Sequence, residues 1–384
     1  FQLKNGFPLN TIAGTAVDLT KIQLRAQDPN QRSSYVEQAS FGPEFQLFED
    51  TVLSTTYVGN WGRKMNRLRN ANQGLITGRD GACPVVSFPY ANLNTVSSVD
   101  TLNTATGKCG LTGQHAFLEL ATNDGSSDYN GLEVSLRRRM SKGVGYAVNY
   151  TWSHGMSNFG DNLTAGPLPQ NGYDYASEMS NSILDIRHRF VTNFTWELPF
   201  GKGKRYLSNG GASDVVLGGW QFNGIITLQT GSPFTVTATD RSFTGSNHSA
   251  YANCVGDPFS GATTDPSKYT STTPGQFFIN PAAFAIPADG TFGTCRPRSL
   301  HGPGIQLADL SLFKQFQVNE RIRIQFRTEF FNAFNHPNFA NPGSNISNPG
   351  SFGKVTNTIN PILGAGSGGP GDPREIQLAL KLYF

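Results

Sequence analysis

Apolar and polar residues alternate along Arg374–Phe384, the last segment of the chain. One face of an extended strand would carry Ile376, Leu378, Leu380, Leu382 and Phe384, and the other Glu375, Gln377, Ala379, Lys381 and Tyr383. Because successive side chains of a strand point to opposite faces, the segment predicts a strand that is apolar on one side only. Its length of about ten residues and its final aromatic ring are typical of a strand that crosses a bilayer. A soluble sandwich strand can share this alternation.

The alternation recurs along the chain and predicts about nine strands in all. In Gly145–Ser153, for example, Tyr146, Val148, Tyr150 and Trp152 share one face. The other regular segments are Leu132–Arg137, Arg189–Leu198, Trp220–Gln229 and Arg321–Phe330, and the less regular ones are about Tyr35–Phe45, Thr51–Arg69 and Ala308–Gln317.

The polar faces of these segments carry Arg, Glu, Gln and Asn, which a dry sandwich core would not accept. Such side chains need water or one another. A wet interior and an apolar exterior are the pattern of an outer-membrane β-barrel. We therefore predict an all-β, antiparallel transmembrane β-barrel segment.

The links between the predicted strands alternate between short and long. The short ones are Gln46–Asp50, Ser141–Val144, about Pro199–Asp214 and Val318–Glu320, and the long ones are about Asn70–Ser127, His154–Leu184, Asp240–Leu307 and His336–Pro373. Outer-membrane barrels have short periplasmic turns and long external loops. If Phe384 lies at the periplasmic end, every short link is periplasmic and every long link is external.

The amino-acid composition further narrows the class of protein to which this chain can belong. Only 15% of the 384 residues are charged, against roughly 25% in soluble domains. Mean hydropathy is negative and no run of 18 apolar residues occurs, which argues against a helical membrane protein. The net charge of +3 is too small to indicate a nucleic-acid partner.

The chain starts at Phe1 in a polar stretch, without an initiator Met or a secretory signal. We interpret it as the C-terminal portion of a longer protein. Residues 1–34 are expected to be an external loop or lead-in, and residues 35–384 the barrel portion, without a plug domain.

Four cysteines lie in two of the long links. Cys83 and Cys109 share one, and Cys254 and Cys295 share another. Four cysteines allow three pairings. We favour Cys83–Cys109 and Cys254–Cys295, which would close each loop in an oxidising compartment.

Several segments together resemble the C-terminal barrel of TonB-dependent receptors of the Oar-like type. They are Asp128-Tyr-Asn-Gly-Leu-Glu-Val-Ser-Leu-Arg-Arg-Arg139, Tyr146-Ala-Val-Asn-Tyr-Thr-Trp-Ser153, Asp185-Ile-Arg-His-Arg-Phe-Val191 with Leu198-Pro-Phe-Gly-Lys-Gly203, Gly218-Gly-Trp-Gln-Phe-Asn-Gly224 with Thr230-Gly-Ser-Pro-Phe234, and Phe326-Arg-Thr-Glu-Phe-Phe-Asn-Ala-Phe-Asn-His-Pro337. The resemblance covers nearly the whole chain from about Tyr35.

The resemblance implies an outer-membrane transporter with a barrel of about 22 strands and a plugged lumen. It implies partners as well: the TonB complex, through an N-terminal region that this chain lacks, the barrel-assembly machinery, outer-membrane lipid and a transported ligand that the sequence does not identify. The C-terminal strand, with Leu378, Leu380, Leu382 and Phe384, would be the assembly signal. Plug, TonB-contacting segment and more than half of the strands are missing.

No segment predicts a catalytic, cofactor or metal site. Asp185 and His188 should point to opposite faces of a strand, so we expect a rim network there instead of a catalytic pair. Asn123–Asn130 resembles a partial calcium loop without its final bidentate acid, and a turn before a strand is the favoured interpretation. Gly201–Arg205 and Gly364–Gly371 lack the context of a phosphate-binding motif and are expected to be a turn and a loop.

Five arginines on the polar faces have two interpretations. Arg137, Arg139, Arg189, Arg323 and Arg327 could form a basic lumen for an anion, or could pair across strands with Glu133, Glu197, Glu329 and Glu375. Pairing is favoured. Trp152, Trp196 and Trp220 are expected in interfacial girdles.

The sequence therefore predicts part of a receptor that binds a substrate through external loops for energised import across the bacterial outer membrane, and no catalysed reaction. A passive porin or an adhesive structural barrel is the alternative, and a secreted glycan-binding β-protein is a third. An upstream plug would favour the transporter, and recovery without detergent would exclude both membrane classes. Because nine antiparallel strands cannot close into a ring, we expect an open wall with edges at Tyr35–Phe45 and Arg374–Phe384.

Overall fold

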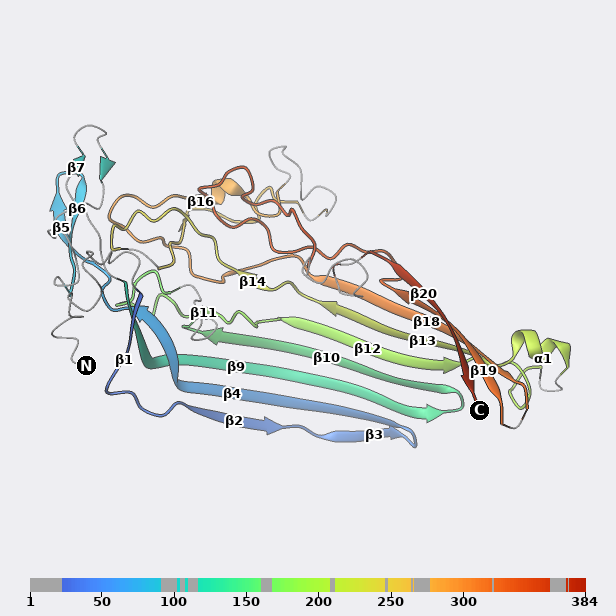
Figure 1. Cartoon of the computed structure of the whole chain (residues 1–384). Coiled ribbons are helices and arrows are strands. Elements are labelled where there is room, and N and C mark those ends of the chain that lie inside the picture. Colours follow the sequence, from blue (N-terminus) through green and yellow to red (C-terminus); the bar gives the residue numbers. More distant parts are fainter. Residues whose placement is uncertain are drawn as a thin grey trace, which may run out of the picture.

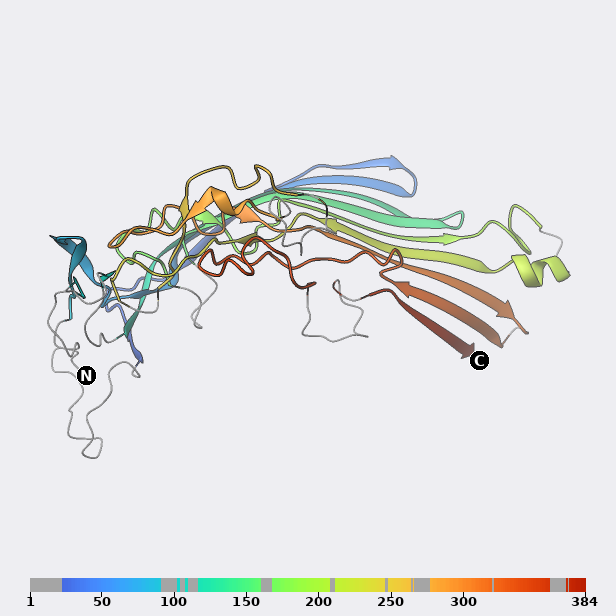
Figure 2. The same cartoon turned by 90° about the horizontal axis from the view of Figure 1, so that it is seen from above.

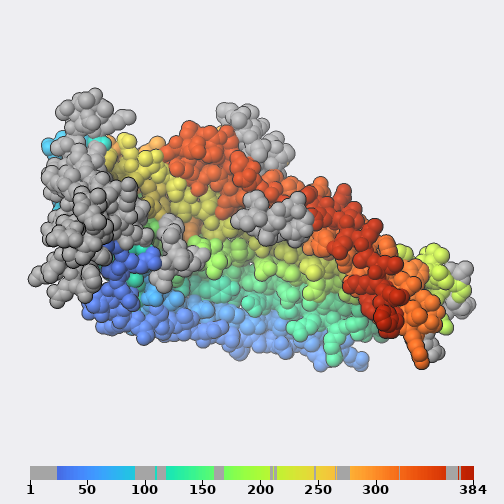
Figure 3. Space-filling model, viewed as in Figure 1, coloured from blue at the N-terminus to red at the C-terminus, as the bar shows by residue number. Residues whose placement is uncertain are grey.

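The computed structural model describes residues 23–90, 102–103, 108–109, 117–159, 168–207, 211–245, 248–263, 265, 277–319, 321–359, 371 and 373–384. Within these residues the fold is one large curved sheet whose strands run side by side, with long connections gathered at one end (Figures 1 and 2). In the space-filling view, neighbouring strands form bands in chain order from blue to red (Figure 3). No helix in the described part is long and apolar enough to span a bilayer.

Nine strands form the continuous path of the sheet, in the order β2-β4-β9-β10-β12-β13-β18-β19-β20. Their bounds are Tyr35–Phe41 (β2), Thr51–Asn70 (β4), Phe117–Ser141 (β9), Val144–Ser157 (β10), His188–Glu197 (β12), Trp220–Gln229 (β13), Ile305–Gln317 (β18), Arg323–Phe331 (β19) and Glu375–Tyr383 (β20). Each pairs antiparallel with its neighbours, as the sequence predicted.

Among the described strands, β2 and β20 are the two ends of this path and do not pair with each other, which confirms the open wall. Three short strands join the sheet off the path: β1 (Gln23–Gln27), β3 (Glu44–Phe48) and β11 (Ser180–Asn181). β1 pairs in parallel with β9, an exception to the antiparallel prediction. The lead-in expected over 1–34 thus contains a strand, and residues 1–22 lie outside the described part.

The register places apolar residues of neighbouring strands in common rows. Tyr146, Phe194 and Gly224 form one row, which continues through Leu310 and Phe330 to Ile376. We call this side of the sheet the apolar face and the opposite side the polar face. On β20 the apolar face is open to its surroundings, since Leu378 and Leu380 are 65% and 73% exposed. A row of apolar side chains exposed to this extent along β20 marks a surface that another phase must cover.

β9 is longer than the sequence predicted. Its first half, Phe117–Ser127, belongs to the strand and pairs with the distal half of β4. Thr122–Ser127 is polar on both faces, so the alternation that identifies a strand is absent there. Asn123–Asn130 is therefore strand and not the expected turn.

The short links lie at the end of the sheet that holds the C-terminus, which we call the turn end (Figure 1). Lys142 and Gly143, both at positive φ, close the tight turn between β9 and β10. The link after β12 contains the short helix α1 (Ala212–Leu217). Glu320, at the end of another predicted short link, lies outside the described residues.

The long links lie at the opposite end, the loop end, and contain the buried apolar core of the described structure. They include the short strands β5 (Leu75–Asp80), β6 (Cys83–Ser87), β7 (Leu102–Asn103), β8 (Lys108–Cys109), β14 (Pro233–Phe234), β15 (Asn253–Cys254), β16 (Phe284–Ala285) and β17 (Leu300–His301), and the 3₁₀ turn η5 (Pro281–Ala283). The core cluster consists of Phe234, Val236, Ala238, Ala252, Ile279, Ala283, Phe284, Cys295 and Phe352. The loops are thus folded, although the sequence predicted no structure for them.

Two disulfides hold these links. Cys83 is bonded to Cys109 and Cys254 to Cys295, the loop-local pairing favoured from the sequence. We call the described parts of 168–187, 230–304 and 332–359 the loop layer. Its segments also join through backbone hydrogen bonds, such as Thr237 N–H to Ser344 O at 2.8 Å and Ile346 N–H to Thr237 O at 2.9 Å.

Candidate functional site

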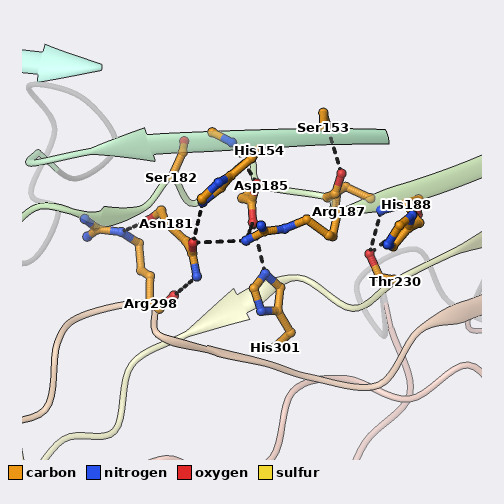
Figure 4. A network of polar contacts seen from close by, with 12 residues as sticks. Ser153, His154, Asn181, Ser182, Asp185, Arg187, His188, Thr230, Arg298 and His301 are labelled. Carbon is orange, nitrogen blue, oxygen red and sulfur yellow. Dashed lines mark hydrogen bonds and ion pairs between the residues drawn. The ribbon is translucent and has the colours of Figure 1, made fainter. Parts of the chain in front are cut away.

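A polar network fastens the loop layer to the wall at the loop end of β10 and β12 (Figure 4). Its centre is Asp185, whose side chain is fully buried. One oxygen accepts a hydrogen bond from Gly155 N–H at 2.8 Å, and the other lies 3.1 Å from His301 Nε2 and 3.2 Å from the Arg187 guanidinium. A single carboxylate therefore joins β10, the segment before β12 and β17 of the loop layer.

These contacts determine the charge of Asp185. Burial alone would raise the pKa of its carboxyl group. The hydrogen bond from His301, the Gly155 N–H and the charge of Arg187 outweigh burial and lower the pKa. Asp185 is thus held as an anion, which supports a permanent contact between loop and wall.

Arg298 extends the network. Its guanidinium donates to the carbonyl oxygens of Asn181 at 2.5 Å, Ser157 at 3.0 Å and Glu178 at 3.3 Å. Asn181 returns a hydrogen bond from Nδ2 to Arg298 O at 2.8 Å, as Figure 4 shows. One side chain of the β13–β18 link thereby satisfies three backbone acceptors of β10 and the β10–β12 link.

Beside Arg298 lies a buried acid. Glu178 is 4% exposed and accepts hydrogen bonds from Tyr251 Oη at 2.7 Å and from Gln170 N–H at 2.9 Å. Burial raises the pKa of Glu178, despite these two hydrogen bonds and the nearby Arg298 and Arg67. Burial and the carboxyl group of Glu178 together raise the pKa of Tyr251, so its hydroxyl keeps its proton.

These residues line a small cavity of about 110 Å³ between the wall and the loop layer. β4 contributes Arg67, which is 5% exposed and lies 2.9 Å from Asp124 of β9. Its guanidinium stacks on the ring of Tyr175, with 3.1 Å between Cζ and the ring centroid. Polar groups of Arg67, Glu178, Tyr251 and Arg298 share its lining with apolar side chains, and it is large enough for a few ordered waters or a small polar group. Within the described residues, no group of three or more His, Cys, Asp or Glu could hold a metal ion.

The structure separates the predicted pair Asp185 and His188, as expected. His188 Nδ1 lies 2.8 Å from Tyr150 Oη on the apolar face, whereas Asp185 contacts His301, 116 residues further along the chain. No pattern in the sequence pointed to His301, because the contact depends on how the loop layer folds. Asp124 and Asp128, in the predicted calcium-loop segment, each contact an arginine of β4.

The predicted Arg–Glu pairing across strands is wrong. No ion pair among the described residues joins Arg137, Arg139, Arg189, Arg323 or Arg327 to Glu133, Glu197, Glu329 or Glu375. The register explains this, because it places Arg189 opposite Thr151 and Gln229, and Arg327 opposite Phe313 and Ala379. Glu197 instead contacts Lys204, within the predicted Gly201–Arg205 turn, at 2.6 Å. The predicted loop Gly364–Gly371 lies outside the described residues except for Gly371 itself.

A second ionic contact within the loop layer predicts a pH dependence. Burial alone would lower the pKa of His248, but its hydrogen bond to Asp240 and the charge of that residue raise it. Burial alone would raise the pKa of Asp240, but the contact with His248 lowers it. The stabilisation from His248 is complete below its unfolded pKa of about 6.5 and is lost as pH rises through the higher folded pKa. That from Asp240 is present above about pH 3.9 and is lost as pH falls through the lower folded pKa.

We therefore expect the contribution of the His248–Asp240 contact to the stability of the loop layer to be largest between about pH 4 and 6.5 and to weaken above this range. Thermal unfolding of the full-length protein at pH 5, 6.5, 8 and 9 measures the trend. His248→Gln should flatten the alkaline limb, with Gln306→Asn as the control on an exposed side chain. An unchanged alkaline limb in His248→Gln contradicts the assignment.

Comparison with known proteins gives a family and a set of distant structures. The family model described as outer membrane beta barrel domain matches residues 1–377. A search of curated proteins found no match. The similar solved structures include the outer membrane transporter YddB from Escherichia coli, with 8% identity and a TM-score of 0.42, covering 94% of this chain and 34% of that one.

Two further structures are similar at the same level. The FrpB iron transporter from Neisseria meningitidis has 10% identity and a TM-score of 0.39, over 94% of this chain and 32% of that one. The ferric-catecholate import receptor Fiu from Escherichia coli K12 has 12% identity and a TM-score of 0.36, over 91% and 27%. The chain spans about a third of the length of these structures.

Proposed function

Because the chain belongs to the outer membrane beta barrel domain family and lies in the outer membrane, we propose that it forms the C-terminal wall of a TonB-dependent receptor. The apolar face contacts lipid, the polar face lines the lumen, the loop end is external and the turn end is periplasmic. The intact protein binds a substrate through its external loops and imports it with energy relayed by the TonB complex. TonB and the plug act through a region outside this chain.

The observation that carries this proposal is the folded loop layer. It has its own buried apolar core, a disulfide between Cys254 and Cys295, and the Asp185 network that fixes it to the wall. Binding surfaces are commonly built on loops that a rigid scaffold holds in place. A passive pore needs a free passage and not a fixed external layer, so this arrangement favours a receptor over a porin.

Comparison of a strain that carries the full-length gene with its deletion strain tests the proposed function. Mass spectrometry of the medium should reveal a solute that only the gene-carrying strain depletes. Deletion of TonB, or collapse of the proton-motive force, should abolish this depletion while the barrel stays at the cell surface. Depletion that continues in both cases, together with steady conductance of the purified protein in planar bilayers, contradicts the proposal and favours the porin.

We also propose that β20 is the signal for the barrel-assembly machinery. Leu382 and Phe384 are 59% and 97% exposed at the free edge of the described sheet, where they are available to another protein. Deletion of Phe384 from the full-length protein should reduce the amount of folded barrel, measured by its heat-modifiable mobility in gels, whereas Phe334→Ala, a loop-end control, should not. Equal amounts of folded barrel with and without Phe384 exclude this role for the terminal ring.

A further inference from the structure

An open groove of about 510 Å³ lies on the apolar face at the loop end of the sheet. Its floor is one row of the register, in which Tyr150, Phe190, Leu228 and Gln306 follow one another across β10, β12, β13 and β18. The row below it, toward the turn end, contains Val148 and Ile226 on the same face. The groove is therefore continuous with the surface that we assign to lipid.

The second wall of the groove comes from the link after β19 and is firmly held. His336, Pro337 and Phe339 line it. Asn332, 3% exposed, accepts from His336 N–H at 2.9 Å and donates to His336 O at 3.0 Å, which fixes the turn. Gln306 N–H donates to Asn338 Oδ1 at 2.7 Å and attaches this wall to β18.

The groove changes from apolar to polar along its length. Phe190 and Leu228 lie on the membrane side, and His188 lies two residues nearer the loop end on the same face, beside Thr230 (Figure 4). The exposed side chain of Gln306 and the ring of His336 add further polar groups. The polar groups thus lie in two directions from Phe190 and Leu228: toward the loops at His188, and across the sheet at Gln306 of β18. An occupant that matches both parts of the groove is amphiphilic.

The polar groups indicate the headgroup class. The residues that line the groove include no Lys, Arg, Asp or Glu. Imidazole, amide and hydroxyl groups both donate and accept hydrogen bonds, which suits sugar hydroxyls, whereas phosphate is bound most strongly by cations. Tyr150 and Phe339 add ring surfaces. We propose that this groove binds a glycolipid of the outer leaflet, with an acyl chain along Phe190 and Leu228 and a sugar at His188, Gln306 and His336.

This inference rests on the proposed orientation, in which the loop end is external. It does not depend on TonB, on import or on the identity of the substrate. A binding measurement on the purified full-length protein therefore tests it separately from the transport experiment.

The test compares two lipids with identical acyl chains, monogalactosyl diacylglycerol and phosphatidylglycerol. Native mass spectrometry of the delipidated, full-length protein in detergent should give about tenfold tighter binding of the galactolipid, the size expected from two net hydrogen bonds. The His188→Ala/His336→Ala double variant and the Gln306→Ala variant should lose this preference. Leu380→Ala, on the same face but outside the groove, should keep it.

Each outcome of the lipid-binding test either supports the proposal or overturns it. Equal binding of both lipids by the unaltered protein overturns the headgroup assignment. If Leu380→Ala also loses the preference for the galactolipid, the apolar face as a whole causes that preference and the groove does not. Because Gln306 is exposed, its variant remains informative if the histidine double variant does not fold.

Discussion

Replacing Leu380 by Arg is expected to destabilise the inserted barrel by about 2–4 kcal/mol. Leu380 lies near the middle of β20, is 73% exposed and stands opposite Phe326 in the apolar face. A guanidinium at this depth would lie in hydrocarbon, where its hydration is lost and no counter-charge is near. The cost falls toward either interface, so Ile376→Arg and Leu382→Arg should be milder.

The matched control for Leu380→Arg is Gln377→Arg on the same strand. Gln377 lies on the polar face opposite Glu329, where an arginine meets water and an acid. Its substitution should change the free energy of unfolding by less than about 0.5 kcal/mol. Urea titration of the full-length protein in lipid vesicles measures both variants. Equal effects of the two substitutions would contradict the assignment of faces.

Replacing Asp185 by Ala is expected to lower the free energy that holds the loop layer to the wall by about 2–4 kcal/mol. The substitution removes the acceptor of the Gly155 N–H and leaves the Arg187 and His301 side chains without their anion. The loss is no larger because Arg187 and His301 are 31% and 26% exposed and can regain water.

Hydrogen exchange of the full-length protein localises this effect. Protection should fall in 178–188 and 298–301 and stay unchanged in β19 and β20, because local opening involves only the segments that the carboxylate joins. Asp185→Asn should lose less protection than Asp185→Ala, since the amide oxygen of Asn can still accept the hydrogen bond from Gly155 N–H. Glu37→Ala, an exposed control on β2 far from the network, should lose no protection in these segments. Unaltered protection in Asp185→Ala would show that the apolar core alone holds the loops.

Alternation along the chain predicted the nine path strands and both faces of the sheet, because period two is a local property that each strand expresses by itself. It failed at Thr122–Ser127, where both faces are polar and no period remains. Loop lengths predicted which links share an end. They could not predict the core around Phe234 and Ile279, because Gly- and Pro-rich loops gather their apolar residues from distant positions without a period.

The contacts of the candidate site could not be predicted from the sequence, for a similar reason. Asp185 and His188 were singled out because they are neighbours, yet the partner of Asp185 is His301 and that of Glu178 is Tyr251. Such pairs form only when separate loops fold together. The predicted pairing of arginines with glutamates was wrong because it depends on the register of neighbouring strands. Both strands of a pair determine that register, and a single strand's pattern does not reveal it. Arg138 lies between Arg137 and Arg139, the two arginines for which pairing was predicted. It is Arg138 that forms an ion pair, with Asp50 at 3.1 Å.

The central claim is that the sheet is a bilayer-embedded wall with lipid on its apolar face and water on its polar face. Spin labels placed singly along β20 of the full-length protein in vesicles test it most directly. We predict high oxygen and low nickel-chelate accessibility at Leu378, Leu380 and Leu382, and the reverse at Gln377, Ala379 and Lys381. Accessibility without this alternation, or nickel-chelate access at all six positions, would contradict the account.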